Sequence, residues 1–170
     1  REIVRPRGAE LAAAVGGAVI PNERLMDEVV NLVEHPLPIL GSFDPRYLEL
    51  PREVLLTSME AHQKSFGVED ASGKLKPHFL TVLNLEPKGL DLVRKGWERV
   101  LRARLEDGRF FWKTDLAAGF EPWLKELDSV VFLAPLGSMG DKSRRLERLT
   151  RWLGERLAPD LAGDLARAGL

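Results

Sequence analysis

The chain has 170 residues, of which 44% are hydrophobic and 30% are charged, and its formal net charge is −1. These values are typical of a soluble globular protein and argue against a disordered or membrane-spanning chain. Cysteine is absent, which excludes disulfide scaffolds and thiolate metal sites. Because the net charge gives no overall basic field, any contact with a nucleic acid must come from local clusters of arginine.

The first third of the chain predicts two helices and a strand before a third helix opens. A short Ala-rich helix is expected over residues 10–15, where Gly16-Gly17 ends it. Asn22 is the expected N-cap of a helix over residues 23–34. A buried strand is expected at residues 37–43, and Leu50-Pro51-Arg52-Glu53 opens the next helix, with proline near its first turn.

The rest of the chain predicts a hairpin followed mainly by helices. Strands at residues 65–68 and 78–85 are joined by a turn, and the second is apolar enough to be covered on both faces. A helix, a strand, a charged helix and the start of another helix then follow, over residues 90–112, 129–133, 141–157 and 161–170. Because strands and helices do not alternate regularly, we expect an α+β fold, with a mixed sheet of short strands, packed helices and a C-terminal helical extension.

The sequence contains no motif for catalysis, nucleotide binding or metal binding. It has no Gly-rich phosphate loop, H-E-x-x-H or G-x-S-x-G, and Gly137–Lys142 lacks the phosphate-loop spacing. His35, His62 and His78 have no ligand partner two to four residues away. We therefore expect no catalytic and no metal-ligating residue. His62 could close a helix end as a partly buried polar residue, or it could read a base.

The helix expected over residues 90–112 has an apolar side and a charged side. The apolar stripe, which we expect to be core, comprises Trp97, Leu101, Leu105, Gly108, Phe111 and Trp112. Glu98, Arg102 and Glu106 are spaced by four residues, which favours a ladder of ion pairs. Arg99 has no acid three or four residues away, and Arg104 fits the ladder poorly. These two arginines are therefore the best candidates to contact something else.

A second cluster of cations is expected on the helix over residues 141–157. It comprises Lys142, Arg144, Arg145, Arg148 and Arg151, beside an apolar stripe of Leu146, Leu149, Leu153 and Leu157. Two arginine-rich helix faces in a nearly neutral chain indicate contacts with phosphates. A solvated face explains the same pattern, so both interpretations stay open.

Five segments in order resemble one family, the beta subunits of bacterial glycyl-tRNA synthetase. They are EVVNLVEHP (28–36), GSFDPRYLELPREVLLTSMEAHQKSF (41–66), DASGKLKPHFLTVLNLEPK (70–88), KGWERVLRARLEDGRFFWKTDL (95–116) and LGSMGDKSRRL (136–146). The chain departs from the family pattern at Ser65, Trp97 and Gly108-Arg109.

The resemblance implies a part of a ligase of protein synthesis, in the cytoplasm and away from membranes. The enzyme would contain two alpha and two beta chains, and aminoacylation with ATP and magnesium would belong to the alpha chain. No cofactor is expected in this part. We expect a lead-in over residues 1–22, an α+β domain over 23–137 like the editing-type domain of the phenylalanyl-tRNA synthetase beta chain, and a helical extension over 138–170. The extension would lead into a further domain that resembles an HD phosphohydrolase.

The leading hypothesis is a non-catalytic module that helps to bind and position glycine tRNA. The candidate tRNA-binding residues are Arg99, Arg102, Arg104, Lys113, Lys142, Arg144, Arg145 and Arg148. The alternative is an architectural domain for assembly with the alpha chain, in which the arginines form ion pairs. A residual editing hydrolase is a third hypothesis.

Overall fold

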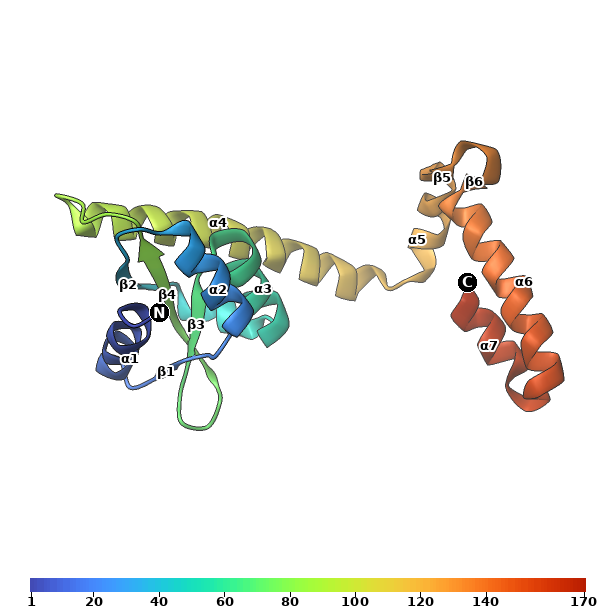
Figure 1. Cartoon of the computed structure of the whole chain (residues 1–170). Helices are drawn as coiled ribbons and strands as arrows, with labels where there is room; N and C mark the ends of the chain where they lie inside the picture. Colours follow the sequence, from blue (N-terminus) through green and yellow to red (C-terminus); the bar gives the residue numbers. More distant parts are fainter. The chain divides into compact units, whose positions relative to one another are not determined.

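The computed structural model describes all 170 residues, and their packing divides them into two compact units, Arg1–Lys113 and Thr114–Leu170. Figure 1 follows the chain through both units in sequence order. The helix α4 (Leu90–Ala118) begins in the first unit and ends in the second. This division by packing differs from the boundaries expected at residues 22 and 137, which stay predictions about the domains of the family.

The N-terminal unit is an α+β structure, which confirms the predicted fold class. Its elements before α4 are α1 (Val4–Ala14), β1 (Ala18–Val19), α2 (Glu23–Leu32), β2 (Leu37–Ser42), the 3₁₀ helix η1 (Pro45–Glu49), α3 (Arg52–Gln63), β3 (Phe66–Glu69) and β4 (Leu75–Leu83). The strands form one sheet in the order β1-β3-β4-β2. All neighbours are antiparallel, so the sheet expected as mixed is not mixed. A tight hairpin joins β3 to β4, and such short links pair strands only in the antiparallel sense.

Local chemistry sets the ends of these helices. The side chain of Asn22 accepts a hydrogen bond of 2.9 Å from the backbone N of Leu25, which confirms the predicted N-cap of α2. Helix α3 begins after Pro51 and ends at Lys64, whose φ of 51° lies in the left-handed region. Helix α1 begins six residues earlier than predicted, and Pro6 is tolerated there because the first helical turn needs no amide donor.

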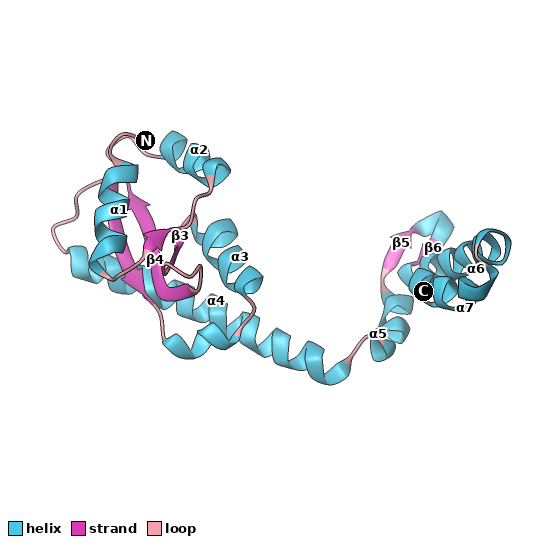
Figure 2. Cartoon of the chain, turned by 90° about the horizontal axis from the view of Figure 1, so that it is seen from below, coloured by secondary structure: helices cyan, strands magenta, loops and turns pink.

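Strand β4 is covered on both faces, as predicted. Leu80 packs on one face with residues of α1 and α2, including Val4 and Val29. Phe79 packs on the opposite face with residues of η1, α3 and α4, including Tyr47 and Leu101. Figure 2 shows the strands of this sheet enclosed by helices. The sheet is thus the middle layer between two helical layers, and it fixes the position of α4.

The ring of Phe79 lies over a glycine of a neighbouring strand, Gly41. Gly41 of β2 and Gly67 of β3 are both paired with Phe79 across the sheet. A Cβ added at Gly41 would overlap the ring, and one added at Gly67 would lie 2.8 Å from Leu56. Phe79 itself is fully buried. The two glycines are therefore required by close approach, not by an unusual backbone conformation.

The C-terminal unit contains short elements around one long helix. After α4 it comprises α5 (Glu121–Glu126), the 3₁₀ helix η2 (Leu127–Ser129), β5 (Val131–Leu133), η3 (Ala134–Leu136), β6 (Gly137–Ser138), α6 (Met139–Leu157), η4 (Pro159–Leu161) and α7 (Ala162–Gly169). Strands β5 and β6 pair with each other. Helices α6 and α7 agree with the helices predicted at residues 141–157 and 161–170.

This unit buries almost no apolar side chains. Its buried residues are Gly140, Gly154 and Ala166, and both hydrophobic clusters of the chain lie in the N-terminal unit. The predicted apolar stripe of α6 is exposed along its length: Leu146, Leu149, Leu153 and Leu157. The stripe has the expected helical spacing, but α7 packs against the glycine side of α6 instead.

A capping box starts α6. The side chain of Ser138 accepts from the backbone N of Asp141 at 3.1 Å, and the carboxylate of Asp141 accepts from the backbone N of Ser138 at 2.9 Å. The hydrogen bond from the Ser138 backbone, followed by Arg144 and the Ser138 hydroxyl, lowers the pKa of Asp141 to about 2. The Gly137–Lys142 segment is thus a loop into a helix, as predicted, with Asp141 near the positive end of the helix dipole.

The capping box predicts a loss of stability in acid. The folded pKa of Asp141, about 2, lies below its ordinary value of 3.8. The contribution of Asp141 to the free energy of unfolding is therefore complete above about pH 4 and is lost as the pH falls towards 2. Amide hydrogen exchange of the first turn of α6, measured across this range, should show the loss, and Asp141→Asn should flatten the profile. Asp160→Asn is the control, and equal profiles for the two variants would refute the assignment.

Candidate nucleic-acid interface

Two carboxylates of α4, those of Glu98 and Glu106, bind the body of the N-terminal unit. Glu98 accepts hydrogen bonds from the backbone N and the hydroxyl of Ser42, at 2.9 and 3.0 Å. Glu106 accepts from the hydroxyl of Tyr47 at 2.7 Å and also pairs with Arg46. Both carboxylates thereby join α4 to the segment that follows β2.

The Tyr47–Glu106 contact is the most buried part of this connection. Tyr47 is fully buried, and burial is the main cause that raises the pKa of its hydroxyl. The hydrogen bond from Tyr47 is the main cause that lowers the pKa of Glu106. Without Glu106 the buried hydroxyl would keep only its contact with Arg46, at 2.9 Å. A buried polar group needs such partners, so Glu106 is committed to Tyr47.

The predicted ladder of Glu98, Arg102 and Glu106 is therefore wrong. The two carboxylates bind donors of β2 and η1, and Arg102 makes neither an ion pair nor a side-chain hydrogen bond. An exposed pair along a helix contributes only about 0.3–0.5 kcal/mol, which is little beside the cost of leaving the buried hydroxyl of Tyr47 unbonded. The charge of Arg102 is consequently available to another molecule.

Unpaired cations line the exposed side of α4. Arg99, Arg102 and Arg104 are all exposed and have no partner. Lys95 is also exposed and unpaired, and the sequence prediction missed it. Its position four residues before Arg99 and seven before Arg102 could have identified it, because such spacing places side chains on one helix face. Lys95, Arg99 and Arg102 are called the α4 basic face below.

Three other residues of α4 do not belong to the α4 basic face or to the core stripe expected from the sequence. Arg104 lies two residues beyond Arg102, so helical spacing places it on another side of α4 from the α4 basic face. Phe111 was expected in the core but is 60% exposed. The hydrophobic cluster ends with Leu105 and the half-buried Trp112, and Phe111 points away from this stripe. Lys113 pairs with Glu49 of η1, with 3.7 Å between Nζ and Oε1.

Most of the cations predicted on α6 already have partners. Arg144 pairs with Asp128 at 2.7 Å and Asp141 at 3.0 Å, and Arg145 donates to the carbonyl of Leu136 at 3.0 Å. Lys142 lies over the ring of Phe132, 4.4 Å from its centre.

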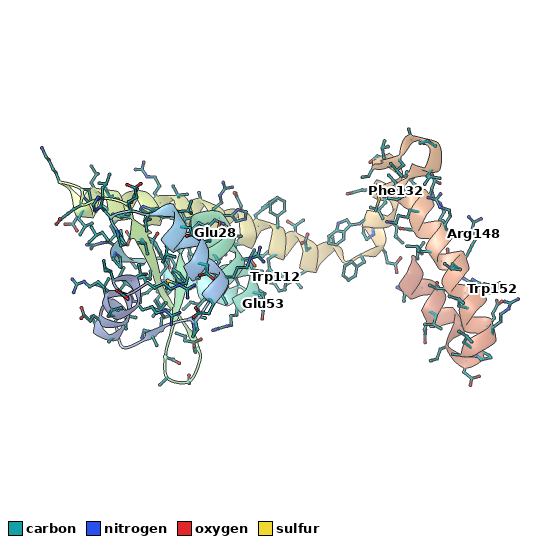
Figure 3. The ribbon with its side chains drawn as sticks, in the orientation of Figure 1. Glu28, Glu53, Trp112, Phe132, Arg148 and Trp152 are labelled. Carbon is teal, nitrogen blue, oxygen red and sulfur yellow. The ribbon has the colours of Figure 1, made fainter.

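Arg148 is the one candidate on α6 without a partner. Figure 3 shows that its side chain and that of Trp152 project from the same side of α6. Arg151, four residues after Glu147, pairs with it at 3.0 Å. The structure therefore leaves Arg148 as the cation of α6 that is best placed to bind an external phosphate.

The chain matches a known family over its whole length. The sequence profile of the family described as "Glycyl-tRNA synthetase beta subunit" matches residues 1–170. The chain belongs to this family. The expectation of this family, drawn from the five sequence segments, is thus confirmed.

Curated relatives agree with the family. The beta subunit of glycine–tRNA ligase from Nitratidesulfovibrio vulgaris strain DP4 is 68% identical over 169 residues, which are 99% of this chain and 24% of the relative. The beta subunit from Solidesulfovibrio magneticus is 54% identical over 168 residues, 98% of this chain and 24% of the relative. The Magnetococcus marinus protein is 46% identical over 159 residues, 94% and 23% of the two chains. The chain thus spans about a quarter of the length of these relatives.

The structure divides the predicted tRNA-binding residues into unpaired cations and cations that already have partners. The predicted tRNA-binding residues fall on two helices. Arg99, Arg102, Arg104 and Arg148 are unpaired, whereas Lys113, Lys142, Arg144 and Arg145 are held by other groups of the chain. No group of three or more histidine, aspartate or glutamate side chains is arranged to hold a metal ion. No helix is both long and apolar enough to cross a membrane.

Proposed function

We propose that this part of the glycyl-tRNA synthetase beta chain binds tRNA through the α4 basic face and helps to position it for glycine attachment. One observation carries the proposal: Glu98 and Glu106, the carboxylates nearest to Arg102 along the helix, are bonded to other elements. Arg102 is thereby left without a counter-charge, and Arg99 has no acid three or four residues away along α4. Exposed guanidinium groups of this kind bind phosphate oxygens, often through two parallel hydrogen bonds.

The remaining predicted residues contribute less to the proposed interface. Arg148 and Arg104 are unpaired and add phosphate contacts on other surfaces. Arg144 would have to leave Asp128 and Asp141 before it could bind a phosphate. The proposed role includes no catalytic residue, so the isolated chain should not attach glycine to tRNA. ATP, magnesium and the aminoacylation site would belong to the alpha chain.

The test is the salt dependence of tRNA binding by the intact synthetase. Arg99→Gln combined with Arg102→Gln should weaken binding and make log Kd less steep against log salt. The slope should change by about 0.7–0.9 for each lost phosphate contact, because each contact releases condensed counterions. Filter binding between 50 and 200 mM salt would measure the slope.

A matched control removes the same number of charges elsewhere. Arg5 and Arg7 of α1 pair with Glu23 and Glu10, at 2.7 and 2.8 Å. Arg5→Gln combined with Arg7→Gln should therefore leave the slope unchanged. Equal slopes for both double variants would refute the proposed interface.

The alternative role, assembly with the alpha chain, is favoured by the exposed apolar side of α6. Leu149, Trp152 and Leu157 are each at least half exposed, and exposed apolar groups of this size mark surfaces that another protein covers. Under this alternative the arginines of α4 form ion pairs with the alpha chain instead of binding tRNA. The Arg99→Gln/Arg102→Gln variant would then bind tRNA as the control does. The complex of this variant with the alpha chain would dissociate at lower salt than the unchanged complex, which gel filtration would detect.

A further inference from the structure

A crevice borders the α4 basic face in the N-terminal unit. It lies between α2, the end of α3, β4 and α4, and it has a volume of about 650 Å³. Its lining is mostly apolar and includes Val33, Val82, Gly96, Trp97 and Val100. Val100 is half exposed. A cavity of this size and character can hold one drug-sized or nucleoside-sized group.

One buried polar group in the lining lacks a partner. Gln63, the last residue of α3, is only 6% exposed. Its Nε2 donates to the carbonyl of Trp97 over a long 3.4 Å, and its Oε1 has no hydrogen bond at all. Leaving a buried acceptor unbonded is costly. The long bond holds the amide weakly, so the side chain can turn to meet a donor in the crevice.

One unpaired cation of α4 stands beside the crevice. Arg99 lies three residues after the lining residue Gly96, and side chains at that spacing are neighbours on a helix surface. Arg99 has no partner. Lys64, at the α3 side, is already paired with Glu28 at 2.7 Å. Free positive charge therefore lies on the α4 side of the crevice.

We infer that the crevice takes one unstacked nucleobase of a single-stranded RNA segment. The base fills the apolar space beside Trp97, its N–H group donates to Oε1 of Gln63, and Arg99 binds an adjacent phosphate. Proteins that read single-stranded RNA place bases and phosphates in this way. A backbone N–H of a protein segment would also satisfy Oε1, but an aliphatic segment would leave the charge of Arg99 unused. The inference rests on the proposed tRNA binding, because it assigns a base site next to the phosphate contacts.

The test compares RNA tetranucleotides with an abasic tetranucleotide of the same charge, bound to the 170-residue chain. The base-bearing RNA should bind at least about fivefold more tightly than the abasic one, because an inserted base adds stacking and apolar contact. The side-chain amide resonances of Gln63 should shift with the base-bearing RNA only.

Variants of the lining separate the base site from the phosphate site. A Cβ at Gly96 would meet no atom within 4 Å, so Gly96→Leu can fill the crevice without disturbing the fold. Gly96→Leu and Gln63→Leu should each reduce the preference for base-bearing RNA, whereas the matched Gly96→Ala should keep it. Arg99→Gln should weaken the binding of both tetranucleotides.

The outcomes distinguish the two proposals. Equal affinity for base-bearing and abasic RNA would overturn the base site and leave the crevice to an apolar protein segment, while the phosphate contacts would stand. A base preference that survives both Gly96→Leu and Gln63→Leu would also overturn it. No measurable binding of either tetranucleotide would overturn the inference together with the α4 phosphate contacts on which it rests.

Discussion

Phe79→Ala is expected to destabilise the N-terminal unit by about 3–5 kcal/mol, the range for removing a buried aromatic ring. Phe79 is fully buried at the centre of the sheet, and the cluster around it joins η1, α3 and α4. The glycines on both sides offer no side chain that could refill the space. Urea unfolding, followed through the amide resonances of β4, would measure the change. A loss below 1 kcal/mol would show that the ring does not organise this core.

The contact between Phe79 and Gly41 predicts that a substitution at Gly41 also destabilises the N-terminal unit. Gly41→Ala should cost about 1–3 kcal/mol, because the new methyl group overlaps the ring. The double variant Phe79→Ala/Gly41→Ala should be more stable than the sum of the two single effects predicts, because the methyl group of residue 41 then occupies space that the ring has left. Gly96→Ala is the control and should stabilise the unit by up to about 1 kcal/mol, the ordinary gain in a helix. Strict additivity would contradict the contact.

Gly154→Leu is expected to detach α7 from α6. A Cβ at Gly154 would already lie 2.9 Å from the Cα of Ala162, so a larger side chain meets backbone that cannot rotate away. Overpacking of this kind typically costs about 1–3 kcal/mol. The C-terminal unit buries few apolar side chains, so little other burial offsets this cost.

Hydrogen exchange would measure the detachment of α7. Its amides should lose protection in Gly154→Leu, while those of β4 keep theirs and serve as the internal reference. Gly163→Ala is the matched control, because a Cβ there meets nothing within 4 Å. Unchanged protection of α7 would show that contacts other than Gly154 hold the pair.

Features that depend on residues close together in the chain could be predicted from the sequence. The Asn22 cap, the hairpin around Asp70 and the helix predicted over residues 141–157, which begins at Met139, each follow from residues a few positions apart. The family was also evident from collinear segments, and the fold class followed from the order of the elements. Such features need only local backbone preferences and short-range hydrogen bonds.

Which charges are free depends on contacts between residues far apart in the chain. Ser42 and Glu98 are 56 residues apart in the chain, and Tyr47 and Glu106 are 59 apart. Spacing along α4 gave Glu98 and Glu106 the same arginine partner, but Glu98 binds the end of β2 instead, and Glu106 binds the buried hydroxyl of Tyr47 together with Arg46. Arg102 is unpaired for this reason. The exposed leucines of α6 were hidden from the sequence in the same way, since periodicity places them on one face and cannot tell whether anything covers it.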